Sequence, residues 1–192
     1  MKRWSRVLLV GSVVGSCIGC DQVTKVAAHR SLAGSEPLSF FGDMLRLSYV
    51  ENGGAFLGLG SDLPPQVRFW LFGVTVVLVL AVVAARTIGH RWAGAVHLIG
   101  GAMILGGGIG NLIDRAATGV VRDFINVGIG AMRTGIFNVA DLAITTGAVV
   151  MLCSWRGPGA GPGSRPTRFS GRFRVSRRLM KSATTTPRVS RS

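Results

Sequence analysis

The sequence has few acidic residues and few of the side chains that bind metals or form disulfides. Its 192 residues include only eight acidic residues, three histidines and three cysteines. The histidines, His29, His90 and His97, are scattered and form no H-E-x-x-H motif. The cysteines show neither metal-site spacing nor a disulfide framework. We therefore expect no metal and no cofactor, and the composition excludes a disulfide-stabilised secreted scaffold.

Basic charge is concentrated at the C-terminal end of the chain. The formal net charge is +14, and residues 156–192 hold ten basic residues and no acidic one. This segment is rich in Gly, Pro, Ser and Thr, a composition typical of disorder. Because the excess lies in an appendage, it predicts a cytoplasmic tail close to anionic membrane lipids rather than a protein that binds nucleic acid.

The remaining chain, residues 1–155, is dominated by apolar runs. The mean hydropathy of +0.44 is high for a soluble domain of this size. A membrane span needs about 17–25 predominantly apolar residues. With their polar flanks, four runs meet this length, at about 6–22, 67–86, 93–113 and 137–155. The sequence thus predicts an all-α membrane protein with four transmembrane helices, followed by the disordered tail.

The first run allows a second interpretation. It begins with basic residues and ends Cys17-Ile18-Gly19-Cys20, which resembles the signal of a secreted lipoprotein cleaved before Cys20. A secreted lipoprotein would continue as a soluble domain, whereas three more apolar runs follow here. We therefore interpret the segment as an uncleaved first span.

Loop charge predicts the orientation in the membrane. Basic residues flank the first run, occur between the second and third runs, and fill the tail, so the positive-inside rule places both termini in the cytoplasm. Residues 21–68 and 114–136 then face outward, and they hold every acidic residue except Asp141. In the first outer loop, Leu45, Leu47 and Tyr49 alternate with polar residues, which predicts a small extracytoplasmic β element.

Two aspartates at the outer face are the main candidates for chemistry. Asp141 opens the last apolar helix, where a carboxylate is either functional or a helix-start residue favoured by the dipole. Asn138 lies three residues earlier, on the same helical face. Asp123 is flanked by apolar residues and is either a partly desolvated carboxyl or a loop acid paired with Arg122.

If Asp123 and Asp141 meet, one can hold a proton while the other acts as a base on a water. Such a pair hydrolyses amides without a metal. A Ser–Lys site would need Lys25 with Ser39 or Ser48 and has no motif to support it. A small transporter or channel subunit, with Asp141 as an ion site, would need polar residues in several spans, and the first two offer almost none.

Five short blocks occur in order within residues 1–155: Asp21-Gln22-Val23-Thr24-Lys25, Asn52-Gly53-Gly54-Ala55-Phe56, Gly108-Ile109-Gly110-Asn111-Leu112-Ile113-Asp114-Arg115, Val121-Arg122-Asp123-Phe124 and Phe137-Asn138-Val139-Ala140-Asp141. Together they resemble the blocks of one family, the bacterial lipoprotein signal peptidases, also called signal peptidase II.

The resemblance implies a monomeric aspartic endopeptidase of the inner membrane with its site at the outer face. Such an enzyme cuts prolipoproteins before a diacylglyceryl-modified cysteine and contacts membrane lipids. The resemblance makes Asp123 and Asp141 the catalytic pair and gives Asp114 a structural role, ion-paired within its loop. It implies that seven residues bind substrate or support the site: Asp21, Lys25, Asn52, Gly54, Asn111, Arg115 and Asn138.

Overall fold

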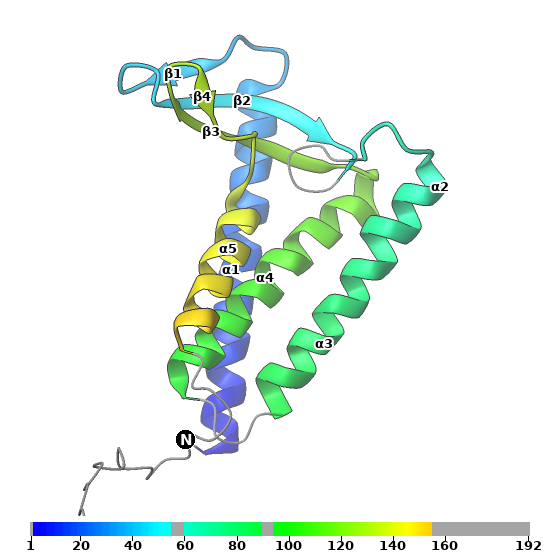
Figure 1. Cartoon of the computed structure of the whole chain (residues 1–192), viewed down its shortest axis with the longest axis vertical. Coiled ribbons are helices and arrows are strands. Elements are labelled where there is room, and N and C mark those ends of the chain that lie inside the picture. Colours follow the sequence, from blue (N-terminus) through cyan, green and yellow to red (C-terminus); the bar gives the residue numbers. More distant parts are fainter. Residues whose placement is uncertain (1, 55–59, 90–93, 155–192) are drawn as a thin grey trace, which may run out of the picture. The chain divides into compact units, whose positions relative to one another are not determined.

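The computed structural model describes residues 2–54, 60–89 and 94–154, which form a set of long helices and one small sheet (Figure 1). A π-helical stretch, Phe69–Val74, joins α2 (Pro65–Arg68) to α3 (Thr75–Gly89), so these segments form one continuous helical run. The helices are α1 (Arg3–Leu32), α2 (Pro65–Arg68), α3 (Thr75–Gly89), α4 (Ala95–Thr118) and α5 (Val139–Cys153).

Three helical runs in the described part of the chain are long and apolar enough to cross a membrane. They are Arg3–Leu32, Pro65–Gly89 and Ala95–Thr118. The fourth, Val139–Cys153, is apolar but has only 15 residues. The predicted helical runs are confirmed, whereas the number of transmembrane spans stays a prediction. The predicted tail lies outside the described residues.

The first helix is longer than the sequence indicated. We expected an outer loop to begin at residue 21, but α1 continues to Leu32. The polar residues Asp21 and Lys25 are both fully buried in it. They stay helical because their side chains find buried partners on other elements, which composition alone does not reveal.

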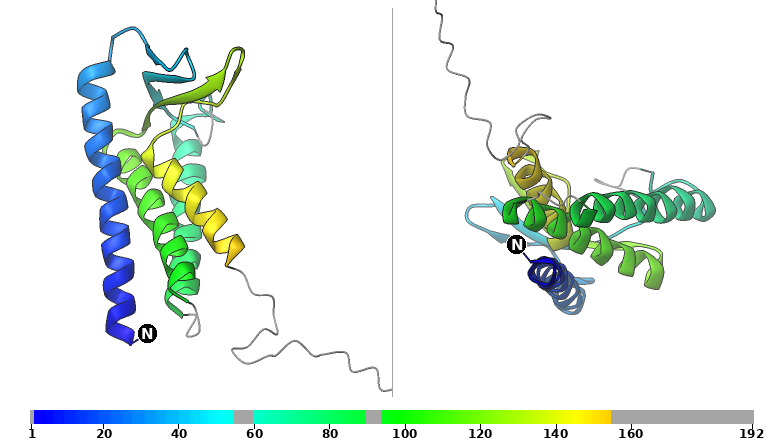
Figure 2. Two further views of the ribbon diagram at one scale, coloured as in Figure 1. Left: turned by 90° about the vertical axis from the view of Figure 1, so that its left-hand side faces the viewer. Right: turned by 90° about the horizontal axis from the view of Figure 1, so that it is seen from below.

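Helix α4 lies at the centre of the helical part and packs against α1, α3 and α5. Both views in Figure 2 show α1 and α5 beside it. Glycines on α4 allow this close approach. A Cβ built on Gly100 would lie 2.9 Å from the carbonyl oxygen of Gly147 on α5, and one built on Gly107 would lie 2.9 Å from Cγ1 of Ile144. Glycines in the Gly106–Gly110 run therefore serve close helix packing.

The sheet is larger than predicted. Its four antiparallel strands lie in the order β1-β2-β3-β4. The expected strand in the first connection is present as β2, but the connection between α4 and α5 supplies half of the sheet. The strands are β1 (Leu38–Phe40), β2 (Leu45–Asn52), β3 (Val121–Ile129) and β4 (Met132–Arg133).

The sheet is fixed to the end of α1 by a small apolar cluster. Ala28 and Leu32 of α1 are buried against Phe124 of β3, and Leu47 and Tyr49 of β2 pack around them. Burial of apolar surface stabilises the folded state by roughly 25 cal/mol for each Å² removed from water. The cluster therefore sets the position of β3, and with it the position of Asp123, relative to the helices.

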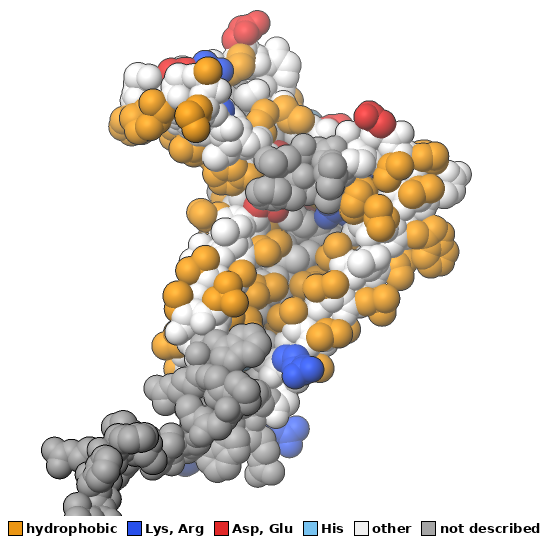
Figure 3. Space-filling model, in the orientation of Figure 1, with side chains coloured by type: hydrophobic (Ala, Val, Ile, Leu, Met, Phe, Trp, Pro, Cys, Tyr) orange, Lys and Arg blue, Asp and Glu red, His pale blue; other side chains and the backbone are white. Residues whose placement is uncertain are grey.

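The two ends of the helical part differ in charge. In the face shown in Figure 3, acidic side chains lie at the end that carries the sheet. Lys2, Arg3 and Arg6 lie at the start of α1 and Arg86 in the last turn of α3, at the opposite end of the helices (Figure 1). This matches the gathering of carboxylates predicted from the sequence.

Substitution of Gly107 by alanine should weaken the packing of α4 against α5. A methyl group there would meet the backbone oxygen of Ala140, so we expect the free energy of unfolding to fall by about 1–3 kcal/mol. The matched control is Gly15→Ala on α1, where nothing lies within 4 Å of the added Cβ. Thermal unfolding in detergent measures both variants, and equal midpoints would contradict this role of Gly107.

Candidate active site

Asp141 is held at the start of α5 by a reciprocal pair of hydrogen bonds. The N-cap residue Asn138 accepts a bond from the backbone N–H of Asp141 at 3.0 Å through its side-chain oxygen. Oδ2 of Asp141 in turn accepts the backbone N–H of Asn138 at 3.2 Å. Asp141 is thus a helix-start carboxylate, one of the two roles considered from sequence. Its Oδ1 accepts a further bond from Nδ2 of Asn111 at 2.9 Å.

Asp123 lies on β3 and is only 3% exposed. Its Oδ1 accepts a bond from Nδ2 of Asn138 at 2.6 Å, and its Oδ2 accepts one from Nδ2 of Asn52 at 2.9 Å. The β2–β3 register pairs Val50 with Asp123 and Asn52 with Val121, so Asn52 and Asp123 are diagonal neighbours. The alternative pairing of Asp123 with Arg122 is wrong, because the guanidinium of Arg122 binds Asp114.

Burial raises the pKa of Asp123 to about 6. Loss of hydration is the main cause, and the nearby carboxylate of Asp141 raises the pKa further. The hydrogen bonds from Asn52 and Asn138 act in the opposite direction. The two aspartates therefore influence each other electrostatically and share Asn138 as a hydrogen-bond partner.

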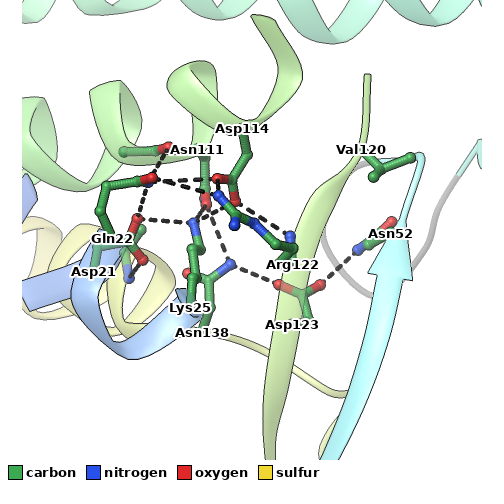
Figure 4. Close-up of polar contacts among 12 residues, drawn as sticks. Asp21, Gln22, Lys25, Asn52, Asn111, Asp114, Val120, Arg122, Asp123 and Asn138 are labelled. Carbon is green, nitrogen blue, oxygen red and sulfur yellow. Dashed lines mark hydrogen bonds and ion pairs between the residues drawn. The ribbon is translucent and has the colours of Figure 1, made fainter. Parts of the chain in front are cut away.

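Lys25 fixes the orientation of one of the asparagines that bind these aspartates (Figure 4). Its fully buried ammonium donates to Oδ2 of Asp21 and to Oδ1 of Asn111, both at 2.8 Å, and lies 2.9 Å from Oδ2 of Asp114. An ammonium group can only donate, so Asn111 must turn its oxygen to Lys25 and its NH₂ group to Asp141.

The orientation of Asn138 is fixed in the same way by a different donor. Its side-chain oxygen accepts the backbone N–H of Asp141, so its NH₂ group must face Asp123 and the oxygen of Asn111. Each asparagine thus presents a donor to one aspartate. Neither amide can be turned over without losing a buried hydrogen bond.

Asp21 connects α1 to the start of α5. Its Oδ1 accepts the backbone N–H of Ala140 at 3.0 Å, and its Oδ2 accepts from Lys25. A carboxylate at a helix N-terminus satisfies one of the backbone donors exposed there. Asp21 therefore places the first turn of α5, which carries Asp141.

We expected Asp114 to be ion-paired within a loop. It is ion-paired, but it lies on a helix and belongs to a buried ion cluster. It lies in α4, is fully buried, and binds Lys25 as well as the backbone N–H and the guanidinium of Arg122. Gln22 completes the cluster with a 3.4 Å bond to Asp114. We did not predict Gln22 and Arg122 as supporting residues from the sequence. Both occur within the five sequence blocks that resemble the family, and this signal could have identified them.

Arg115 and Gly54 form the remaining contact at the edge of the site. Nη2 of Arg115 donates to the backbone oxygen of Gly54 at 2.8 Å. Asn52 also binds this turn, since its side-chain oxygen accepts the N–H of Gly54 at 2.9 Å. The structure thus places all nine candidate residues in one connected set of contacts around Asp123 and Asp141.

Comparison with known proteins gives one consistent family. The family model described as signal peptidase (SPase) II matches residues 13–156. A lipoprotein signal peptidase of Pelodictyon phaeoclathratiforme is 38% identical over 150 residues, covering 73% of this chain and 86% of its own. One of Hydrogenovibrio crunogenus is 36% identical over 135 residues, covering 70% and 77%.

A solved structure shares the fold. It is a bacterial membrane enzyme determined at 2.3 Å by the in meso method. It superposes with a TM-score of 0.61 at 25% identity and covers 78% of this chain and 86% of its own.

The matched region extends over most of the chain and includes both aspartates and the cluster that supports them. We conclude that this chain belongs to the signal peptidase II family of lipoprotein signal peptidases.

Proposed function

We propose that the protein is an aspartic endopeptidase that removes signal peptides from prolipoproteins by cleaving before the diacylglyceryl-modified cysteine. One observation carries this proposal. Two carboxylates from different elements, Asp123 on β3 and Asp141 on α5, are linked through Asn138, and all four of their oxygens accept N–H bonds. This arrangement can hold one proton between two acids next to a water.

In the proposed mechanism, Asp123 holds the proton and Asp141 takes the proton of the attacking water. The raised pKa of Asp123, about 6, supports this division of roles. As the tetrahedral intermediate collapses, the proton on Asp123 passes to the leaving amine. A substrate that covers the site would exclude water and increase the protonated fraction of Asp123.

The proposed orientation has four spans, both termini in the cytoplasm and the catalytic pair at the outer face. The basic residues at the start of α1 and in the last turn of α3, opposite the end where the carboxylates gather, support it. The substrate's signal helix ends at the same outer interface, so the carboxylates would lie at the depth of the scissile bond. The proposed domain is residues 1–155, with 156–192 as an appendage.

Asp141→Asn should fold normally and lose cleavage. Asparagine keeps the size of the side chain but cannot take a proton from water, so we expect the rate to fall roughly 10²–10⁴-fold. The assay is cleavage of a purified diacylglyceryl-modified precursor, with Asp123→Asn expected to behave alike. The control, Asp62→Asn, changes an exposed acid outside the site and should retain activity. Normal processing by Asp141→Asn would refute the assignment.

The pH profile should report the proton on Asp123. Activity should fall as pH rises through the pKa of Asp123, about 6 in the free enzyme. Because the bond from Asn52 lowers the pKa of Asp123, Asn52→Ala should move this decline to higher pH. Asn126 lies on β3, the strand of Asp123, but makes its side-chain hydrogen bonds with Thr134 and Arg133. Asn126→Ala should therefore leave the pH of the decline unchanged. A decline that stays or moves to lower pH in Asn52→Ala would contradict the proposed role.

Removal of residues 156–192 should leave cleavage intact, because the family match ends at residue 156 and the contacts of the site lie before it. The measurement compares kcat/KM of the full chain and the shortened chain after confirming membrane insertion of both. Loss of activity in a correctly inserted shortened chain would show that the tail takes part.

A further inference from the structure

Arg68 differs from most other arginines at the sheet end of the molecule. Within residues 2–54, 60–89 and 94–154, its side chain makes no hydrogen bond or ion pair, and its buried Nε has no acceptor. Arg30, in the last turn of α1, also makes none but is exposed to solvent. The other arginines at this end each donate to a defined acceptor: Arg46 and Arg133 to Asp43, Arg115 to Gly54, and Arg122 to Asp114.

The guanidinium of Arg68 lies against the turn that follows Asn52. A Cβ built on Gly53 would lie 3.2 Å from Cζ of Arg68 and still closer to Nη1, so the guanidinium packs directly against the backbone of Gly53. Asn52, the preceding residue, donates to the catalytic Asp123. Arg68 is therefore at the rim of the site, one residue from a group that contacts the reacting pair.

The surroundings of Arg68 are those of a membrane interface. Arg68 ends α2, and the next two residues, Phe69 and Trp70, are each 64% exposed. Exposed aromatic rings at the end of an apolar helix mark the boundary between lipid and water. At this depth little water is available to accept hydrogen bonds from a half-buried guanidinium. An oxygen acceptor on a bound molecule would therefore stabilise the complex by pairing with its free N–H groups.

We propose that Arg68 binds an ester carbonyl of the diacylglyceryl group on the substrate cysteine. This rests on the proposed function. The lipid is attached at the residue next to the scissile bond, so its two ester carbonyls lie at the rim of the site when the peptide bond reaches Asp123. A guanidinium fork donates to such carbonyl oxygens, whereas a purely apolar groove would hold the acyl chains without sensing the esters.

The test compares two precursors with the same peptide. One carries the natural diester lipid, and the other carries a dialkyl diether that lacks both carbonyl oxygens. For the full-length wild type, we expect kcat/KM to be roughly tenfold higher for the diester, as for loss of one hydrogen bond to a charged group. Arg68→Ala should lower the diester value to the diether value through KM and leave the diether value unchanged.

Two further variants serve as references. Arg68→Lys keeps the charge but not the fork, so its preference for the diester should be intermediate. Arg30→Ala removes the exposed arginine and should keep the wild-type preference.

Three outcomes would overturn the proposal. The first is a wild type that cleaves both precursors equally. This outcome is measured on the wild type alone and does not depend on whether a variant folds. The second is an Arg68→Ala variant that keeps the diester preference. The third is an equal loss on both precursors, which indicates contact with bulk phospholipid or a structural role. A wild type that cleaves neither precursor would instead refute the proposed function itself.

Discussion

The arrangement of the site depends on one buried cation. The ammonium of Lys25 has three N–H donors and three acceptors, on Asp21, Asn111 and Asp114. Through Asp21 it fixes the start of α5, and through Asn111 it directs an amide donor to Asp141. Loss of the cation would break two buried ion pairs and leave the carboxylate of Asp21 without a cation, whereas Asp114 would keep Arg122. Breaking a buried ion pair typically costs about 3–5 kcal/mol. The same group thus stabilises the contacts among α1, α4 and α5 and orients the amide that donates to Asp141, a member of the proposed catalytic pair.

The second aspartate is placed by the sheet. The β2–β3 pairing shifts register between Leu47 and Val50, and this irregularity sets which residue of β2 lies beside Asp123. Because β3 is fixed to α1 by the cluster of Ala28, Leu32 and Phe124, the sheet cannot slide freely over the helices. Asp123 and Asp141 are therefore brought together by a strand and a capped helix start, both more rigid supports than a loop.

Much of this arrangement could be predicted from the sequence, and the remainder could not for identifiable reasons. Apolar runs predicted the helices, and the alternation around Leu47 predicted β2. The continuation of α1 to Leu32 was missed because Asp21 and Lys25 look like loop residues until their buried partners are known. Strand β3 was missed although Val121 to Val127 is rich in β-branched residues, a signal that could have found it. No pattern in the sequence indicated that Arg68 would lie beside Gly53.

The central claim is that a desolvated carboxyl at position 123 shares a proton with its neighbour. The most direct measurement is a ¹³C NMR titration of the protein labelled at its aspartate carboxyl carbons, with Asp123→Asn used to identify the signal. We expect one signal, missing in that variant, to titrate near pH 6. A titration of Asp123 near its ordinary value, about 4, would show a solvated carboxylate and would contradict the proposed catalytic pair.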